Sequence, residues 1–127
     1  MGEVSLAVPA KPEYLHVVRA VVSGMAARQG LTFEDIQDLC LAANEAAGYL
    51  LALPGEAHRL GLRMRSGEGL ELVVSTDAPA TGWPPQLKDS LAWRILSNLV
   101  PDVTFSVQDQ SPVIRLMVQH PDGSSHA

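Results

Sequence analysis

The chain has 127 residues, of which 46% are hydrophobic and 18% are charged, a composition typical of a folded globular protein and not of a disordered one. Nine basic and fourteen acidic side chains give a formal net charge of −5. This charge argues against direct binding to nucleic acid phosphates, whereas it suits a partner with a basic surface.

No stretch reaches the roughly 18–20 apolar residues that a membrane-spanning helix needs, and the first residues do not read as a signal peptide. We therefore expect a cytoplasmic protein with no membrane contact. Residues 1–127 are expected to form one domain, with residues 121–127 as a disordered tail. The histidines at positions 16, 58, 120 and 126 lack the spacing of metal ligands, so no metal site is predicted.

The chain opens with a predicted edge strand and a predicted helix. Residues 3–8 alternate between apolar and polar side chains before Pro9 and Pro12, as expected for a short strand at the edge of a sheet. From Pro12 to Arg28, apolar residues recur at helical spacing. Gly30 then supplies the left-handed conformation that commonly ends a helix.

The strongest predicted element is the helix from Thr32 to Leu53. Thr32 is a good N-cap, and Pro54-Gly55 ends the helix. Its apolar face is predicted to contain Ile36, Leu39, Cys40, Ala43, Ala47, Leu50 and Leu51, and its opposite face Glu34, Asp38, Glu45 and Tyr49. The only cysteine, Cys40, is expected to be a small buried hydrophobe, with a redox role as the alternative.

Two hairpins and a third helix follow. Residues 59–65 and 70–76 read as the first hairpin, and the proline-rich residues 77–86 as a loop. The third helix is predicted to run from Leu87 or Leu91 to Val100. A last hairpin joins residues 103–107 to residues 114–118 across a turn at 108–112. This order predicts an α+β fold, a two-layer sandwich with a mostly antiparallel sheet and three helices on one face. The other face of the sheet is expected to be partly wet, or covered by a second copy of the chain.

Three stretches resemble a known superfamily. They are D-L-C-L-A-A-N-E-A-A-G-Y from Asp38 to Tyr49, L-V-V-S-T-D ending at Asp77, and S-L-A-W-R-I-L-S-N-L-V-P-D-V-T-F from Ser90. Together with the order of elements, they resemble the GHKL ATPases of gyrase and histidine kinases. Within that superfamily the chain looks most like the anti-sigma factors that are serine kinases of anti-anti-sigma factors, in a divergent, actinobacterial-like form. The resemblance covers roughly residues 5–118 and implies the histidine-kinase-like ATPase fold.

The resemblance also implies a nucleotide site, but the chain departs from its pattern. Glu45 matches the general base and Asp77 the aspartate that reads adenine, whereas Tyr49 stands where an asparagine ligates magnesium. A phenol is a poor ligand for Mg²⁺, which prefers hard oxygens in tight octahedral geometry. Proline and threonine replace the glycines after Asp77, and Ser90-Leu91-Ala92-Trp93 replaces a later glycine turn. We expect a vestigial site made of Glu45, Tyr49 and Asp77, with at best weak binding of ATP and magnesium.

The partner-binding residues also come from the resemblance. In that family, the sigma factor and the anti-anti-sigma factor compete for a surface that includes an arginine on the first helix, which aligns with Arg19. Tyr14 and His16 are weaker candidates, and an ordinary exposed arginine is the alternative for Arg19. Trp93 is expected in the core, whereas Trp83 is left open between core filler or loop anchor and partner contact.

Three functions follow as hypotheses. The first is an anti-sigma factor that sequesters an alternative sigma factor and is released by an anti-anti-sigma factor with a STAS domain. The second is an active ATP-dependent serine kinase, with Glu45 as general base. The third is an orphan protein-binding module on the same fold. The resemblance further implies a homodimer.

Overall fold

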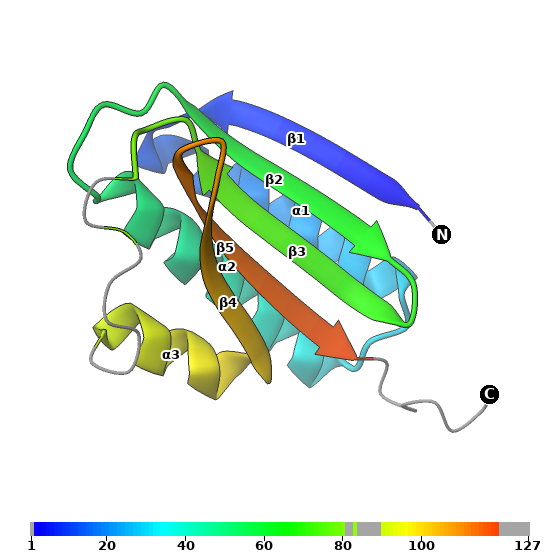
Figure 1. Cartoon of the computed structure of the whole chain (residues 1–127). Helices are drawn as coiled ribbons and strands as arrows, with labels where there is room; N and C mark the ends of the chain where they lie inside the picture. Colours follow the sequence, from blue (N-terminus) through cyan, green and yellow to red (C-terminus); the bar gives the residue numbers. More distant parts are fainter. Residues whose placement is uncertain (1, 81–82, 84–89, 120–127) are drawn as a thin grey trace.

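The computed structural model describes residues 2–80, 83 and 90–119, which form two layers (Figure 1). The elements in chain order are β1 (Glu3–Pro9), a 3₁₀ turn (Pro12–Tyr14), α1 (Leu15–Arg28), α2 (Phe33–Leu51), β2 (Arg59–Ser66), β3 (Gly69–Thr76), α3 (Leu91–Leu99), β4 (Asp102–Gln108) and β5 (Ser111–Gln119). The strands form one sheet in the order β1-β2-β3-β5-β4, with every neighbouring pair antiparallel. The helices cover one face of this sheet, which confirms the predicted α+β fold (Figure 1).

Local hydrogen bonds and backbone conformations account for where the helices begin and end. Thr32 caps α2, because its hydroxyl accepts a hydrogen bond from the Asp35 amide at 3.1 Å. Gly30, with φ of 72°, ends the preceding helix in the left-handed conformation. The helix predicted from Pro12 instead starts as a 3₁₀ turn, and its α-helical part begins only at Leu15.

The buried side of α2 is wider than the predicted stripe. It comprises Leu39, Ala42, Ala43, Ala46, Ala47 and Leu50, each at most 1% exposed. Ala42 and Ala46 were not predicted, and they are buried because α2 packs against α1 and α3 as well as against the sheet. The four alanines allow a close approach of the helix to its neighbours. Ile36 and Leu51, which were predicted on the apolar face, are only half-buried.

Cys40 is half-buried, which corrects the prediction of a buried side chain. Its thiol lies at the boundary between the first two helices, with Sγ 3.9 Å from the backbone oxygen of Arg19. Burial raises the pKa of the Cys40 thiol. Since the thiolate is the reactive form, this environment lowers the reactivity of the cysteine.

The last hairpin is tighter than its sequence indicated. Asp109 and Gln110 both have positive φ, 52° and 68° respectively, as a two-residue type I′ turn requires. Pro112 therefore lies inside β5, opposite Val107, and not in the turn. The turn also contacts the segment after β3, because the Ala80 amide donates to the Gln110 oxygen at 3.0 Å.

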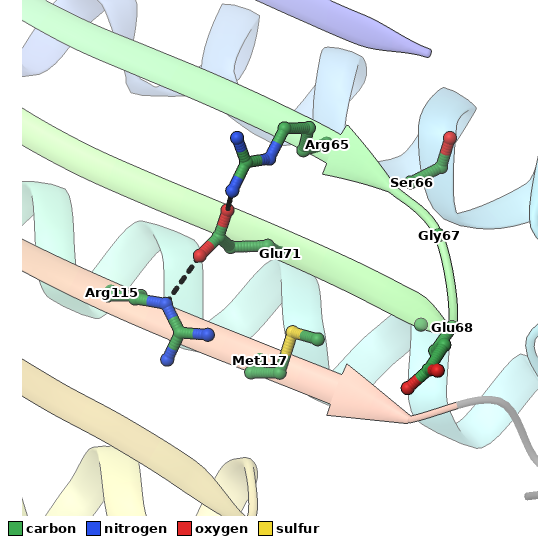
Figure 2. A pocket seen from close by; sticks show the side chains of 8 residues that line it. Arg65, Ser66, Gly67, Glu68, Glu71, Arg115 and Met117 are labelled. Carbon is green, nitrogen blue, oxygen red and sulfur yellow. Dashed lines mark hydrogen bonds and ion pairs between the residues drawn. The ribbon is translucent and has the colours of Figure 1, made fainter. Parts of the chain in front are cut away.

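The face of the sheet away from the helices carries a network of ion pairs (Figure 2). Arg65 contacts Glu71 at 3.0 Å, and Arg115 contacts both Glu71 and Asp102. The network borders a pocket of about 310 Å³ beside the β2–β3 turn, lined by residues 65–69, Glu71, Arg115 and Met117. This network makes the face polar, and both expected states of the face, partly wet or covered by a second copy of the chain, stay predictions.

We predict opposite effects of adding a methyl group at two glycines. A Cβ on Gly69 would overlap the backbone oxygen of Val118 on the neighbouring strand, whereas a Cβ on Gly24 in α1 would meet nothing within 4 Å. Gly69→Ala should lower the free energy of unfolding by about 1–3 kcal/mol. Gly24→Ala should raise it by about 0.5–1 kcal/mol, because alanine is the better helix former. Urea denaturation measures both, and equal effects of the two variants would contradict this packing of β3 against β5.

The ion pairs of Glu71 predict a pH dependence. The hydrogen bond from Arg115 and the charges of Arg115 and Arg65 lower the pKa of the Glu71 carboxyl, whereas its burial raises it. Because the pKa is lower in the folded state, the stabilisation is complete above the ordinary glutamate pKa of about 4.3. It is lost as the pH falls through the lower value of the folded state.

Between about pH 6 and pH 3, wild type should therefore lose more unfolding free energy than Glu71→Gln. Denaturation curves across this range measure the difference. The control Glu68→Gln, in the exposed turn beside the network, should follow wild type. A Glu71→Gln variant with the full pH dependence of wild type would refute the stabilising role of the network.

Candidate functional site

The three residues of the predicted nucleotide site come from two elements. Glu45 is exposed on α2, and Tyr49 is half-buried one turn later on the same helix. Asp77 follows directly after the last residue of β3. The surroundings of each side chain decide whether it is free to bind a ligand.

The carboxylate of Asp77 is bound to the protein's own backbone. Its Oδ1 accepts hydrogen bonds from the amides of His58 at 2.8 Å and Arg59 at 3.1 Å. Burial raises the pKa of Asp77, but these hydrogen bonds outweigh burial and hold the pKa below its ordinary value. Asp77 thus joins the end of β3 to the start of β2.

Tyr49 belongs to an aromatic cluster that we define as Tyr49, Trp83, Trp93 and Phe105. Trp83 stacks on Phe105, with ring centroids 4.9 Å apart and planes 9° apart, and the centroid of Tyr49 lies 5.8 Å from that of Trp83. Trp93 meets Phe105 edge-on at 5.8 Å. Helical spacing predicted that Tyr49 shares the solvent-facing side of α2 with Glu45. The structure corrects this prediction, because the Tyr49 ring packs into the aromatic cluster.

Trp83 is anchored in this cluster by its polar edge as well as by its ring. Its indole Nε1 donates to the Ser106 oxygen at 2.6 Å, and its side chain is only 7% exposed. Of its two predicted roles, the structure supports core filler and loop anchor. Trp93, which was predicted in the core, is only half-buried and packs against the core.

The start of α3 is capped by its own sequence. Ser90 lies at the N-cap, and its hydroxyl accepts a hydrogen bond from the Trp93 amide at 3.2 Å. The first amides of a helix are common anion-binding groups, and one of those in α3 is already satisfied by this side chain. The alternative helix start at Leu87 lies outside the described residues.

The predicted partner-binding residues lie on or beside α1. Arg19 is exposed, and its Nη1 donates to Oδ1 of Asn44 on α2 at 2.7 Å. His16 is also exposed, with Nδ1 2.8 Å from the Glu13 oxygen, whereas Tyr14 is half-buried against the core. The structure thus brings Arg19 together with Asn44, which sequence reasoning missed. Their contact depends on how the two helices pack, and no pattern in a single sequence records that packing.

Two expected absences can be examined only within the part of the chain that the structure describes. There, no group of three histidine, cysteine, aspartate or glutamate residues could hold a metal ion. Among the same residues, no helix combines the length and the apolar character needed to span a membrane. The predicted tail, residues 121–127, lies outside the described residues.

No family model matches the chain. It is 46% identical over 43 residues to the serine-protein kinase RsbW of Bacillus velezensis, a match of 34% of this chain and 27% of the relative. It is 49% identical over 75 residues to the serine-protein kinase RsbW of Halalkalibacterium halodurans, a match of 58% of this chain and 46% of the relative. The chain therefore spans less than half the length of either relative.

Solved structures show the same fold at low sequence identity. The RsbU and RsbW domains of a Mycobacterium tuberculosis protein match 94% of this chain and 32% of that chain, with a TM-score of 0.72 and 12% identity. A histidine kinase domain from Erythrobacter litoralis matches 93% of this chain and 64% of that chain, with a TM-score of 0.56 and 17% identity. The chain therefore has the histidine-kinase-like ATPase fold and is similar to RsbW serine-protein kinases over part of its length, in line with the resemblance to anti-sigma factors of the serine-kinase type.

Proposed function

We propose that this chain is an anti-sigma factor with a degenerate nucleotide site. It sequesters an alternative sigma factor in the cytoplasm and releases it when an anti-anti-sigma factor with a STAS domain binds. The observation that carries the proposal is the contrast between two side chains. Tyr49, which the resemblance aligns with the magnesium ligand, is packed against aromatic rings, whereas Arg19, which it aligns with the partner contact, is exposed.

Contacts within the chain support the loss of nucleotide binding at three separate points. Asp77 binds the backbone amides of the first hairpin, and Ser90 binds an amide at the start of α3. The Tyr49 ring packs against Trp83 and Phe105, so a phosphate-bound metal at this position would have to displace aromatic contacts. These contacts support the proposal that the residues present do not hold a magnesium–ATP complex.

The surroundings of Arg19 support the binding role. A free arginine side chain loses about 2 kcal/mol of conformational entropy when it is fixed in an interface. The hydrogen bond to Asn44 already restricts the guanidinium in the free protein. Part of the conformational entropy of the side chain is therefore lost on folding, and less is lost on binding. We also propose that the protein acts as a homodimer, for which the sheet face free of helices is the available broad surface.

An active serine kinase is the second candidate. The observations in its favour are the names of the relatives, which are serine-protein kinases, and the exposure of Glu45 on α2. In that reading Glu45 is the general base, and the aromatic cluster has to open when ATP binds.

A thermal shift experiment separates the two candidates. Ligand at about 100 times its dissociation constant would stabilise the protein by about 2.7 kcal/mol. We expect no shift with millimolar ATP and Mg²⁺, because the protein's own groups occupy the site. The RsbW kinase of Bacillus subtilis serves as the positive control. A clear shift that is abolished in both Glu45→Ala and Asp77→Asn would favour the kinase.

Capture of a sigma factor tests the binding role. The tagged chain, expressed in its native host, should copurify with an RNA polymerase sigma subunit. Arg19→Glu should weaken binding of that purified subunit by at least about 10-fold, since buried interface arginines are frequent anchors. Its unfolding free energy should stay within about 1 kcal/mol of wild type, as is usual for a surface position.

Two further variants sharpen this test. Asn44→Ala should weaken binding less than Arg19→Glu, because it releases the arginine without removing its charge. Arg94→Glu reverses the same charge at an exposed position of α3 and should bind as wild type does. Capture of proteins other than sigma subunits would favour the orphan binding module.

A further inference from the structure

The outward side of α2 carries an exposed leucine in a polar setting. The side chain of Leu41 is 54% exposed. The residues three and four positions away, which are its neighbours on a helix surface, are Gln37, Asp38, Asn44 and Glu45. A well-exposed apolar side chain within a polar ring is the usual arrangement of an anchor in a protein interface.

The charge on α2 has one sign only. Residues 33–51 include Glu34, Asp35, Asp38 and Glu45 but no lysine, arginine or histidine. Among the described residues, none of these four carboxylates takes part in an ion pair. The sheet face behaves differently, since its Glu71 and Asp102 are paired with arginines. Within the described part of the chain, the acidic charge of α2 is therefore available to a basic partner.

The shape of the same side suits the close approach of another helix. Gly48 lies seven positions after Leu41, and a Cβ on it would meet nothing within 4 Å. A glycine inside a helix costs about 0.5–1 kcal/mol relative to alanine, and at Gly48 no close packing within the chain requires it. The 74%-exposed Phe33 lies two turns before Leu41. From Phe33 to Gly48 the helix is about 22 Å long, enough to contact a partner helix of about 15 residues.

We infer that this side of α2 is a docking surface for an amphipathic helix of the partner. Leu41 and Phe33 contact the apolar stripe of that helix. Asp38 and Glu45 face lysine or arginine residues along one side of the stripe, and Arg19, held by Asn44, faces a carboxylate on the other. The inference rests on the proposed anti-sigma function, because it extends the Arg19 surface from the first helix onto the second. It assigns Glu45 to partner binding and not to proton transfer.

Binding of designed peptides tests the chemistry of the surface directly. Two 18-residue helical peptides share one leucine stripe; one has lysines along one edge of the stripe, and the other has glutamates there. In NMR titrations of the full chain, the lysine peptide should shift the amide resonances of Leu41, Asn44 and Glu45 but not those of Val73 and Met117 on the sheet. It should bind at least about 10-fold more tightly than the glutamate peptide, and less tightly as salt is added. Equal affinities, or shifts confined to the sheet, would overturn the inference.

Matched variants test the individual contacts. Leu41→Ser and Glu45→Lys should each weaken binding of the lysine peptide by at least about 5-fold. Val4→Ser, at a 38%-exposed valine of the first strand, and Glu68→Lys, in the β2–β3 turn, make the same chemical changes elsewhere and should leave affinity unchanged. If the controls weaken binding as much as the α2 variants, the surface is wrongly placed.

The sigma subunit captured with the tagged chain separates this inference from the proposed function. If that subunit binds and Leu41→Ser leaves its affinity unchanged, the docking surface is refuted while the anti-sigma function stands. If the chain captures no sigma subunit but binds the lysine peptide as expected, the anti-sigma function fails and the docking surface is supported.

Discussion

The packing of Tyr49 against Trp83 and Phe105 is the interaction on which the functional proposal depends. It joins α2, the segment before α3, and β4 through aromatic contacts, and Trp83 adds a hydrogen bond to the backbone of Ser106. Aromatic pairs of this geometry contribute about 0.5–1.5 kcal/mol each beyond the burial of their surface. A ligand that entered here would have to replace these contacts, whereas a protein that binds the exposed side of α1 would leave them intact.

The two layers of the protein neutralise charge in different ways. On the open face of the sheet, arginines pair with Glu3, Glu71 and Asp102, so most of the charge is compensated within the chain. On the helix layer, the described ion pairs leave the four carboxylates of α2 without a cation. Because Arg19, Arg28 and Arg94 lie on α1 and α3, the acidic character belongs to α2 and not to the whole helix layer, and α2 is the element suited to a basic partner.

The sequence was sufficient to predict the helices, the strands and the fold class, because the signals for these features are local. The cap at Thr32, the glycine at position 30 and the alternating strands each predicted a boundary that the structure confirms. The errors arose where distant parts of the chain meet. Helical spacing placed Tyr49 on the solvent side of α2, but it could not include the contact with Trp83, which lies 34 positions later in the chain. The contact between Arg19 and Asn44 spans 25 positions and depends on the packing of two helices. The roles of Arg19, Glu45 and Asp77 in binding stay predictions.

If the chain has lost nucleotide binding as proposed, the contacts of Asp77 and Ser90 account for the persistence of the fold without a ligand. A hydrogen bond within the chain contributes about 0.5–1.5 kcal/mol to stability, and one to a charged group about 1.5–3 kcal/mol. Asp77 binds two backbone amides of the neighbouring hairpin, and Ser90 binds an amide of its own helix. Both groups stabilise the framework without a nucleotide. Under the proposed function, selection acts on the helix surface that binds the partner, and Glu45 is retained there for its charge instead of its basicity.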